Sequence, residues 1–242
     1  MNLRVLLLII GSLLLPLGCG GPTGPPVRLE PSEFCGEHPD AAIATFEDAN
    51  LEAAIRVALL VGPQEQLTCG LVSGLTRLDA RWAEITSLVG IQNLKSLTLL
   101  GLGSNFLITD IGALSGLTSL TELDLTSNSI TDIGALSGLT SLTTLGLDGN
   151  SITDIGVLSG LTSLRFLLLA SNSITDIGAL SGLTSLTILD LANNPNLTNI
   201  QPLLDNTGLG TDDLVSLLST SVSCTDVAAL RANGVSVLSD CP

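Results

Sequence analysis

A short sequence motif recurs every 22 residues in this chain and limits the folds that it can adopt. Isoleucine recurs at Ile130, Ile152 and Ile174, each time inside the run Ser-Ile-Thr-Asp-Ile-Gly. Asparagine keeps the same step at four positions, Asn128, Asn150, Asn172 and Asn194. A fixed step of this length predicts a solenoid, in which each unit buries its apolar face only by stacking on its neighbours.

Within one unit, the leucines have the period of a β-strand. Leu123 and Leu125 flank Asp124, which places the two leucines in the core and the aspartate on the solvent side. A single strand leaves both of its edges unpaired, whereas stacked copies pair them in one parallel sheet. Asn128 follows the strand, and we expect its amide to bond backbone groups of the adjacent coil, since burying an unsatisfied amide costs roughly 2–7 kcal/mol.

The unit Leu120-x-x-Leu123-x-Leu125-x-x-Asn128-x-Ile130 resembles the 22-residue leucine-rich repeat of internalin-like bacterial surface proteins. The resemblance implies an α/β solenoid, a right-handed coil with a parallel sheet on its concave face. The aromatic content of 2% agrees with a regular core made of Leu and Ile. Seven strands are predicted, at Leu78, Leu100, Leu123, Leu145, Leu167, Leu189 and Val215.

Two kinds of position depart from the repeat. Ala83 and Thr220 stand where the first and last units would carry asparagine, so both units are degenerate. Asn105 lies 23 residues before Asn128, which indicates one extra residue in the region of Phe106-Leu107.

Both ends of a solenoid expose apolar core, so caps are expected on either side of the repeats, which we assign to residues 71–205. Residues 34–70 are assigned to a helical N-terminal cap that resembles the cap of internalin-like proteins. Its helix, Phe46–Val61, is amphipathic and is followed by the helix-breaking pair Gly62-Pro63. The expected inner face of this helix consists of Leu51, Ile55, Ala58 and Leu59.

The N-terminus is typical of an export signal. One basic residue precedes an apolar run, Val5–Leu15, which has the length of a signal-peptide core and is too short to span a bilayer. The next residues, Leu-Pro-Leu-Gly-Cys, resemble a bacterial lipobox, with proline where leucine is usual. The resemblance implies a lipoprotein signal peptide at residues 1–18, lipidation of Cys19 and an outer-membrane location; an ordinary cleaved signal peptide is the alternative. Residues 19–33 are assigned to a flexible tether.

Residues 206–242 are predicted to form a degenerate last repeat and a C-terminal cap that ends in an edge strand at Val235–Val237. Four cysteines flank the repeats: Cys35, Cys69, Cys224 and Cys241. An exported chain can keep disulfides, and four cysteines allow three pairings. We expect Cys35–Cys69 and Cys224–Cys241, because either other pairing would join opposite ends of a long object.

Aspartate also recurs along the repeats, at Asp110, Asp132, Asp154 and Asp176. Each directly precedes Ile-Gly-x-Leu, so we predict that it accepts a backbone N–H bond at the start of a short helical turn. The alternative is a calcium site, which needs about six to eight oxygens that converge on one point. One carboxylate per coil, roughly 5 Å from the next, does not supply them.

No catalytic or cofactor-binding motif occurs in the sequence. The only histidine, His38, stands alone, and no CxxC pair, phosphate-binding loop or dinucleotide fingerprint is present. The 8 basic and 23 acidic residues give a net charge of −15, which opposes binding to a phosphate backbone. We therefore predict a protein that is not an enzyme, has no cofactor or metal, and does not bind nucleic acid.

The side chains between the framework leucines face the concave surface, where a ligand would bind. Four of them are large and apolar although they lie on the solvent side of the alternation: Phe166, Leu168, Ile188 and Leu214. Four more form an acidic strip: Glu122, Asp124, Asp148 and Asp190. Contiguous exposed apolar surface usually marks an interface, so these eight residues predict a ligand with an apolar anchor beside a basic group. The alternative is that they are drifted surface positions of a near-consensus array.

Together these features favour an exported module of the bacterial cell envelope that binds a protein or peptide and touches the membrane only through a lipid anchor. One alternative is a structural or self-associating envelope protein without selective recognition. Another is a glycan binder, against which the scarcity of aromatic residues argues. Adhesion to a host is implied only by the resemblance to internalins, and a fold does not determine a function.

Overall fold

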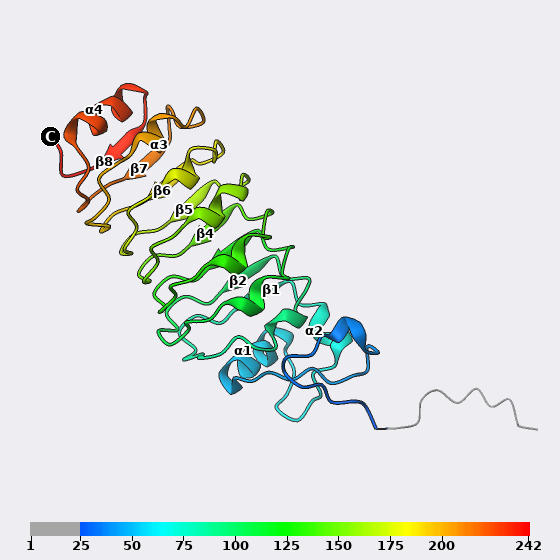
Figure 1. The fold of residues 1–242 in the computed structure, drawn as a ribbon. Coiled ribbons are helices and arrows are strands. Elements are labelled where there is room, and N and C mark those ends of the chain that lie inside the picture. The colour runs from blue at the N-terminus through cyan, green and yellow to red at the C-terminus, as the bar shows by residue number, and fades with distance from the viewer. Residues whose placement is uncertain (1–24) are drawn as a thin grey trace, which may run out of the picture.

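The structure, a computed structural model, describes residues 25–242, and within them eight three-residue strands form one parallel sheet in sequence order (Figure 1). The strands are β1 (Arg77–Asp79), β2 (Leu99–Gly101), β3 (Glu122–Asp124), β4 (Thr144–Gly146), β5 (Phe166–Leu168), β6 (Ile188–Asp190), β7 (Leu214–Ser216) and β8 (Ser236–Leu238). The first seven are centred on the predicted residues. The eighth is the expected edge strand, shifted by one residue. The prediction of a leucine-rich-repeat solenoid is confirmed.

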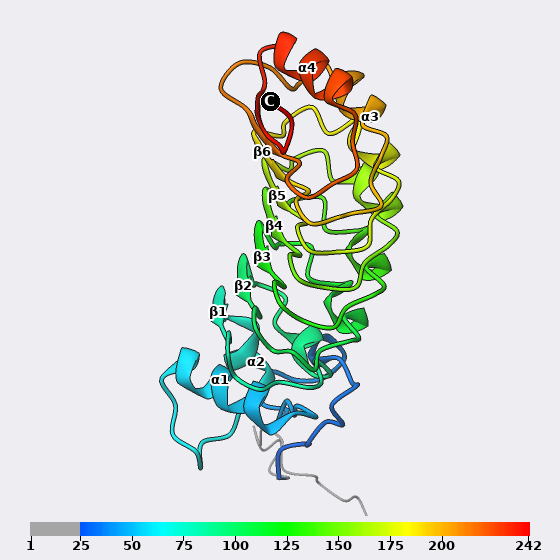
Figure 2. The ribbon, with the colours of Figure 1, turned by 90° about the vertical axis from the view of Figure 1, so that its left-hand side faces the viewer.

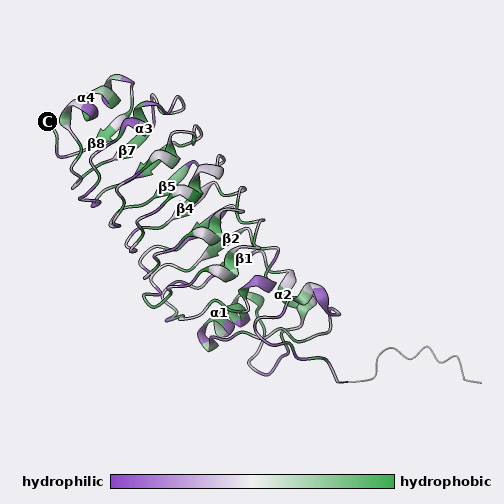
Figure 3. Ribbon diagram, viewed as in Figure 1, coloured by the Kyte–Doolittle hydropathy of each residue, from purple (hydrophilic) through white to green (hydrophobic). Residues whose placement is uncertain are grey.

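Short helical turns line the side of the solenoid opposite the strands (Figure 2). In the repeats they are 3-10 turns: η2 (Ile91–Asn93), η3 (Gly112–Leu114), η4 (Gly134–Leu136), η5 (Gly156–Gly160) and η6 (Gly178–Leu180). Between the two sides lies a core of stacked leucines, in which Leu123 pairs with Leu100 and Leu145 and is 1% exposed. Hydrophobic residues recur in coil after coil along the stack (Figure 3).

The asparagine column bonds adjacent coils together, as predicted. The amide nitrogen of Asn172 donates to the carbonyl oxygens of Leu147 and Leu169, at 3.0 and 3.1 Å. Its amide oxygen accepts the N–H of Ile152 at 3.0 Å. The same three bonds are made by Asn150 and Asn194. Each of these side chains therefore satisfies backbone groups of two coils.

Asn128 is the exception, and the extra residue before it is the cause. In the regular coils the asparagine oxygen accepts the N–H of the residue 20 positions earlier, which for Asn128 would be Ile108. The N–H of Ile108 instead donates to the carbonyl of Asn105 at 2.9 Å. The amide oxygen of Asn128 is buried and has no hydrogen-bond partner. The 23-residue spacing thus breaks the column at one point.

The aspartate column starts the helical turns. The Oδ1 of Asp132 accepts the N–H of Gly134 at 2.7 Å. Equivalent bonds of 2.7–2.8 Å are made by Asp110, Asp154 and Asp176. The predicted backbone bond is confirmed, but the N-cap residue of each turn is the isoleucine that follows the aspartate. Within residues 25–242, no group of three or more His, Cys, Asp or Glu side chains is arranged to hold a metal ion.

The N-terminal cap is built around α1 (Ala49–Leu59), which is shorter at both ends than the predicted helix. Asp48 caps it by accepting the N–H groups of Asn50 and Leu51, and Leu60 ends it with a left-handed φ of 57°. Leu51 and Ile55 are buried against the first coil as expected, whereas Ala58 is exposed on the last turn.

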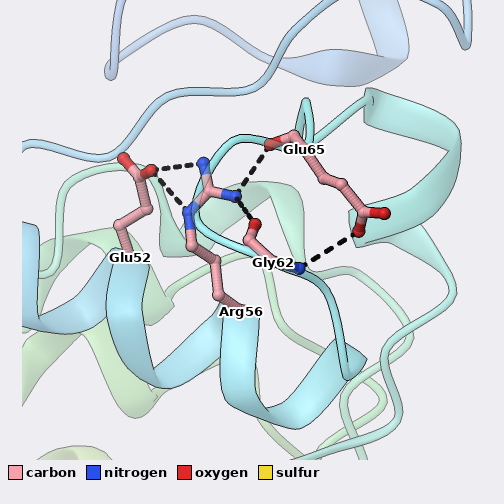
Figure 4. A network of polar contacts seen from close by, with 4 residues as sticks. All are labelled: Glu52, Arg56, Gly62 and Glu65. Carbon is pink, nitrogen blue, oxygen red and sulfur yellow. Dashed lines mark hydrogen bonds and ion pairs between the residues drawn. The ribbon is translucent and has the colours of Figure 1, made fainter.

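A single arginine fastens the loop after α1 to the helix (Figure 4). The guanidinium of Arg56 donates to the Glu52 carboxylate at 2.9 and 2.7 Å. It also donates to the carbonyl oxygens of Gly62 and Glu65, at 3.0 and 2.8 Å. The loop is therefore held against α1 by the Arg56 side chain.

Both predicted disulfides are present. Cys35–Cys69 joins η1 (Cys35–Glu37) to α2 (Cys69–Ser73), with the Cα atoms 5.3 Å apart. Cys224–Cys241 joins the start of α4 (Cys224–Ala232) to the C-terminal residues, with the Cα atoms 5.4 Å apart. One further helix, α3 (Gln201–Leu204), precedes β7. Each end of the stack is thus closed by one covalent bridge.

The predicted signal peptide at residues 1–18, the lipidation site Cys19 and the start of the tether lie outside the described residues. The later part of the tether segment packs against the cap: Leu29 is 2% exposed, and its N–H donates to the carbonyl of Ile43 at 2.9 Å. Across residues 25–242, no helix has the length and apolarity needed to cross a membrane.

Candidate functional site on the concave face

The strand register places the predicted apolar side chains next to one another. Phe166 on β5 pairs with Ile188 on β6, which pairs with Leu214 on β7. Leu168 stands two residues beyond Phe166 on the same face and pairs with Asp190. All four apolar side chains are half-buried. The concave face therefore carries a continuous apolar row that is neither core nor fully exposed.

A basic residue borders this row. The guanidinium carbon of Arg165 lies 5.8 Å from the centre of the Phe166 ring. Arg165 occupies a place that holds threonine in neighbouring coils, at Thr143 and Thr187. An arginine over an aromatic ring contributes roughly 0.5–1 kcal/mol when exposed and holds the ring in position.

Of the four acidic residues, Asp190 pairs with Leu168 of the apolar row, whereas Glu122 and Asp124 are separated from that row by β4. Three of the four are fixed by backbone bonds. Glu122 and Asp124 are on β3, Asp148 follows β4 and Asp190 ends β6. The bonds run from Thr126 N–H to Asp124 (3.0 Å), from Ala170 N–H to Asp148 (2.7 Å) and from Ala192 N–H to Asp190 (2.9 Å). Three carboxylates are thereby held in place before any ligand arrives.

Asp148 has the most perturbed ionisation on this face. Burial raises the pKa of Asp148 to about 6, and the negative charges of Asp190 and Asp124 add to the increase. The N–H of Ala170 acts in the opposite direction. A cation placed beside Asp148 would lower this pKa again, because it would favour the charged form of the carboxyl. The strip is therefore electrostatically suited to a basic group.

A hollow of about 320 Å³ opens on the concave face over β1 to β5. Its lining includes Glu122, Asp124 and Leu168 from the predicted set, together with Leu99 and Thr144. The remaining predicted residues, Phe166, Ile188, Leu214, Asp148 and Asp190, lie outside it, towards the C-terminal end of the face. The predicted set thus spans the rim of a hollow and the apolar row beyond it.

Two glycines make room for the hollow, and the sequence interpretation did not single them out. A Cβ atom at Gly146 would lie 2.9 Å from Oγ1 of Thr126, and one at Gly101 would lie 3.3 Å from Oδ1 of Asp79. The sequence does distinguish these two glycines, because other coils carry Asp or Leu at the equivalent position.

An ion pair stands at the N-terminal end of the hollow. Nη2 of Arg81 lies 2.6 Å from Oδ2 of Asp79, and both side chains are exposed. The hydrogen bond from Arg81 holds the pKa of Asp79 below its usual range. Residues two apart on a strand share a face, so the spacing of Asp79 and Arg81 could have predicted this pair.

Family comparisons agree with the repeat. The model described as "Leucine rich repeat" matches residues 95–152 and 121–174, and the model "Leucine Rich repeats (2 copies)" matches residues 162–205. Among proteins with curated descriptions, none matches the sequence significantly.

Several solved structures from Listeria monocytogenes are similar to this chain. Internalin C2 is 29% identical over 78% of this chain and 93% of its own, with a TM-score of 0.59. An internalin named InlF is 28% identical over 80% of this chain and 64% of its own, with a TM-score of 0.64. The functional domain of InlJ is 31% identical over 73% of this chain and 37% of its own, with a TM-score of 0.65. This chain therefore spans nearly all of the first structure and less than two thirds of the other two.

The repeat length, the parallel sheet and the family matches coincide over the same residues. The structural similarity extends beyond them into the caps, since it covers more than 70% of the chain in each of the three internalins. The chain is a leucine-rich-repeat protein that is similar in sequence and structure to the internalins.

Proposed function

We propose that this protein is a non-enzymatic binding module of the bacterial cell envelope that recognises a protein or peptide on its concave face. The observation that carries the proposal is the apolar row Phe166, Ile188 and Leu214 beside the carboxylates of Asp148 and Asp190. Internalin-like repeats generally mediate protein–protein interaction, and a solenoid offers an extended concave surface for it. The chemistry of this face fits an apolar side chain flanked by Lys or Arg.

Affinity purification from envelope extracts tests the proposal. The wild-type protein is expected to retain a partner that the double variant Phe166→Ser, Ile188→Ser loses, because the substitutions remove the apolar anchor site. Val157→Ser is the matched control, since Val157 is also half-buried but lies in η5 on the opposite side. A partner that stays bound to the double variant would contradict the proposal.

The alternatives give different outcomes in the same preparation. Concentration-dependent association of the purified protein in sedimentation would favour a self-associating structural protein. Binding to a glycan array without any captured protein would favour a glycan binder. Either outcome counts against recognition of a protein by the concave face.

We also propose that residues 1–18 are a lipoprotein signal peptide and that Cys19 carries a lipid that anchors the repeats to the outer membrane. The apolar run and the small residue before Cys19 support this proposal. Growth with a labelled fatty acid should label the wild-type protein and leave Cys19→Ser unlabelled. Equal labelling of the two proteins, or no label in the wild type, would overturn it.

A further inference from the structure

One backbone position adopts a left-handed conformation in each of the seven coils that contain β1 to β7. It precedes the asparagine place and has φ between 54° and 64° at Trp82, Ser104, Ser127, Gly149, Ser171, Asn193 and Ser219. Six of these residues are small or polar, and the seventh is the only tryptophan of the chain. A bulky residue is unfavourable at positive φ, and Trp82 gains no compensating burial because its side chain is 72% exposed. Folding does not account for a tryptophan here.

The neighbouring coil, which contains one extra residue, also exposes large apolar side chains. Phe106 and Leu107 occupy the enlarged turn and are 59% and 67% exposed. A second coil contains the same enlarged turn, in which the N–H of Leu197 donates to the carbonyl of Asn194 at 3.0 Å. That turn is occupied by Pro195-Asn196. The enlarged turn therefore does not require apolar residues.

Trp82 and the enlarged turn of the neighbouring coil lie next to each other. The rings of Trp82 and Phe106 have centroids 6.1 Å apart and planes at 72° to each other. Together with Leu107 and Glu84 they line an open hollow of about 480 Å³. Among the described residues that line this hollow, only Glu84 is charged. The result is a corner of two aromatic rings with one carboxylate beside it.

The two other rings that are at least partly exposed each lie close to a basic side chain. Nζ of Lys95 lies 5.3 Å from the centre of the Phe34 ring, and Arg165 covers Phe166. The remaining aromatic residue, Phe46, is buried. Within residues 25–242, no lysine or arginine lies over Trp82 or Phe106 in this way. The aromatic corner is the part of the described surface where a cation would find an uncovered ring pair.

We propose that the aromatic corner formed by Trp82, Phe106, Leu107 and Glu84 binds an Arg or Lys side chain of a partner protein. The exposed rings attract the cation, tryptophan most strongly, and Glu84 pairs with its charge. Leu107 contacts the apolar neighbours of that side chain. The net charge of −15 favours a basic partner over a second copy of this chain. This site lies apart from the apolar row and does not depend on the function proposed for it.

A saccharide is the other ligand that aromatic side chains commonly bind. A sugar ring stacks on a flat, open ring face, whereas the planes of this pair stand at 72°. A site for an Arg or Lys side chain and a site for a saccharide therefore predict different results when the protein is titrated with each kind of ligand.

Trp82 provides the readout, because its fluorescence is the only tryptophan signal of the protein. The folded chain is titrated with the blocked tripeptide Leu-Arg-Leu, with Leu-Glu-Leu and with chitotriose. We expect a saturable change in emission with Leu-Arg-Leu and none with the other two. The double variant Phe106→Pro, Leu107→Asn copies the residues of the second enlarged turn and so preserves the fold. It should weaken binding about fivefold, and Glu84→Gln should weaken it about threefold.

Leu238→Ser is the control, since it removes another exposed apolar side chain, in β8 at the opposite end of the sheet, and should leave the titration unchanged. Phe166→Ser is measured as well, to detect any binding of the tripeptide on the concave face. Circular dichroism checks that each variant is folded. An equal response to Leu-Glu-Leu, a response to chitotriose alone, or undiminished binding by the double variant would overturn the proposal. A weakened titration in Phe166→Ser would show that the tripeptide binds the concave face instead.

Discussion

At the scale of single residues, the asparagine column shows how one side chain can hold the register of a solenoid. Each regular asparagine bonds a carbonyl of its own coil, a carbonyl of the preceding coil and an N–H of that preceding coil. A slip of one residue would break all three bonds inside an apolar interior, where unpaired polar groups are costly. Asn128 lacks the third bond and therefore offers an internal comparison.

Asn172→Ala is expected to lower the free energy of unfolding by about 3 kcal/mol, because three buried backbone groups lose their partner. Asn128→Ala should cost about 2 kcal/mol, because its amide oxygen has no bond to lose and its removal deletes an unsatisfied atom. Urea denaturation of the two variants measures the difference. Equal losses, or a larger loss at Asn128, would contradict this view of the column.

Asp148 is expected to make stability depend on pH. Its pKa of about 6 in the folded protein exceeds the unfolded value of about 3.9. The folded state therefore binds more protons between these values, and the free energy of unfolding falls as pH rises through this window. Because the site is partly solvated, we expect a loss of roughly 1 kcal/mol between pH 4 and pH 7.

Asp148→Asn keeps an oxygen for the Ala170 N–H and removes the charge. It should be more stable than the wild type at pH 7, by about 1 kcal/mol, and equal to it at pH 4. Asp132→Asn is the matched control, because it removes one charge on the opposite side while keeping a backbone bond. Thermal unfolding at the two pH values measures both variants. If the stability of both variants changed in the same way between pH 4 and pH 7, the raised pKa of Asp148 would not be the cause of the pH dependence.

At the scale of the elements, what could be predicted is what depends on local periodicity. The centres of β1 to β7 follow from the alternation of buried leucines, and the pairing of the cysteines follows from their place outside the repeats. The helices α2 and α3 were not predicted, because one turn of helix is too short to show a period. The packing of residues 28–33 was also missed, since it rests on bonds such as that from Gln92 to Pro31, distant in sequence.

The turn after α3 is expected to be intolerant of a side chain. A Cβ atom at Gly208 would overlap the backbone of Thr184 in the preceding coil, whereas one at Gly210 would meet nothing within 4 Å. Gly208→Ala should therefore cost about 2 kcal/mol or more, and Gly210→Ala should change stability by less than about 0.5 kcal/mol. The difference in Tm between the two alanine variants measures this, and similar Tm values would refute the close approach.

Removal of the C-terminal disulfide should loosen one end of the molecule only. Cys224→Ser with Cys241→Ser is expected to cost about 2–4 kcal/mol in the stability of the last coil. Since each coil contacts only its neighbours, hydrogen exchange should rise in α4 and β8 and stay unchanged in α1. Faster exchange along the whole chain, or none at the C-terminal end, would contradict a local capping role.

At the scale of the whole molecule, the repeat made the proposed binding face partly predictable. Because the step along the chain determines the strand register, it follows from sequence that Phe166, Ile188 and Leu214 are neighbours. The hollow and the aromatic corner could not be derived in this way. The hollow depends on the depth left by Gly101 and Gly146, and the corner depends on turns of two coils that meet only after stacking.

The proposed function requires a partner to contact the concave face. A photoreactive amino acid placed at position 188, on β6, or at position 157, in η5, tests it in the cells that produce the protein. Illumination should yield a covalent adduct with another protein from position 188 and none from position 157. An adduct from position 157 alone, or equal adducts from both positions, would contradict the proposed function.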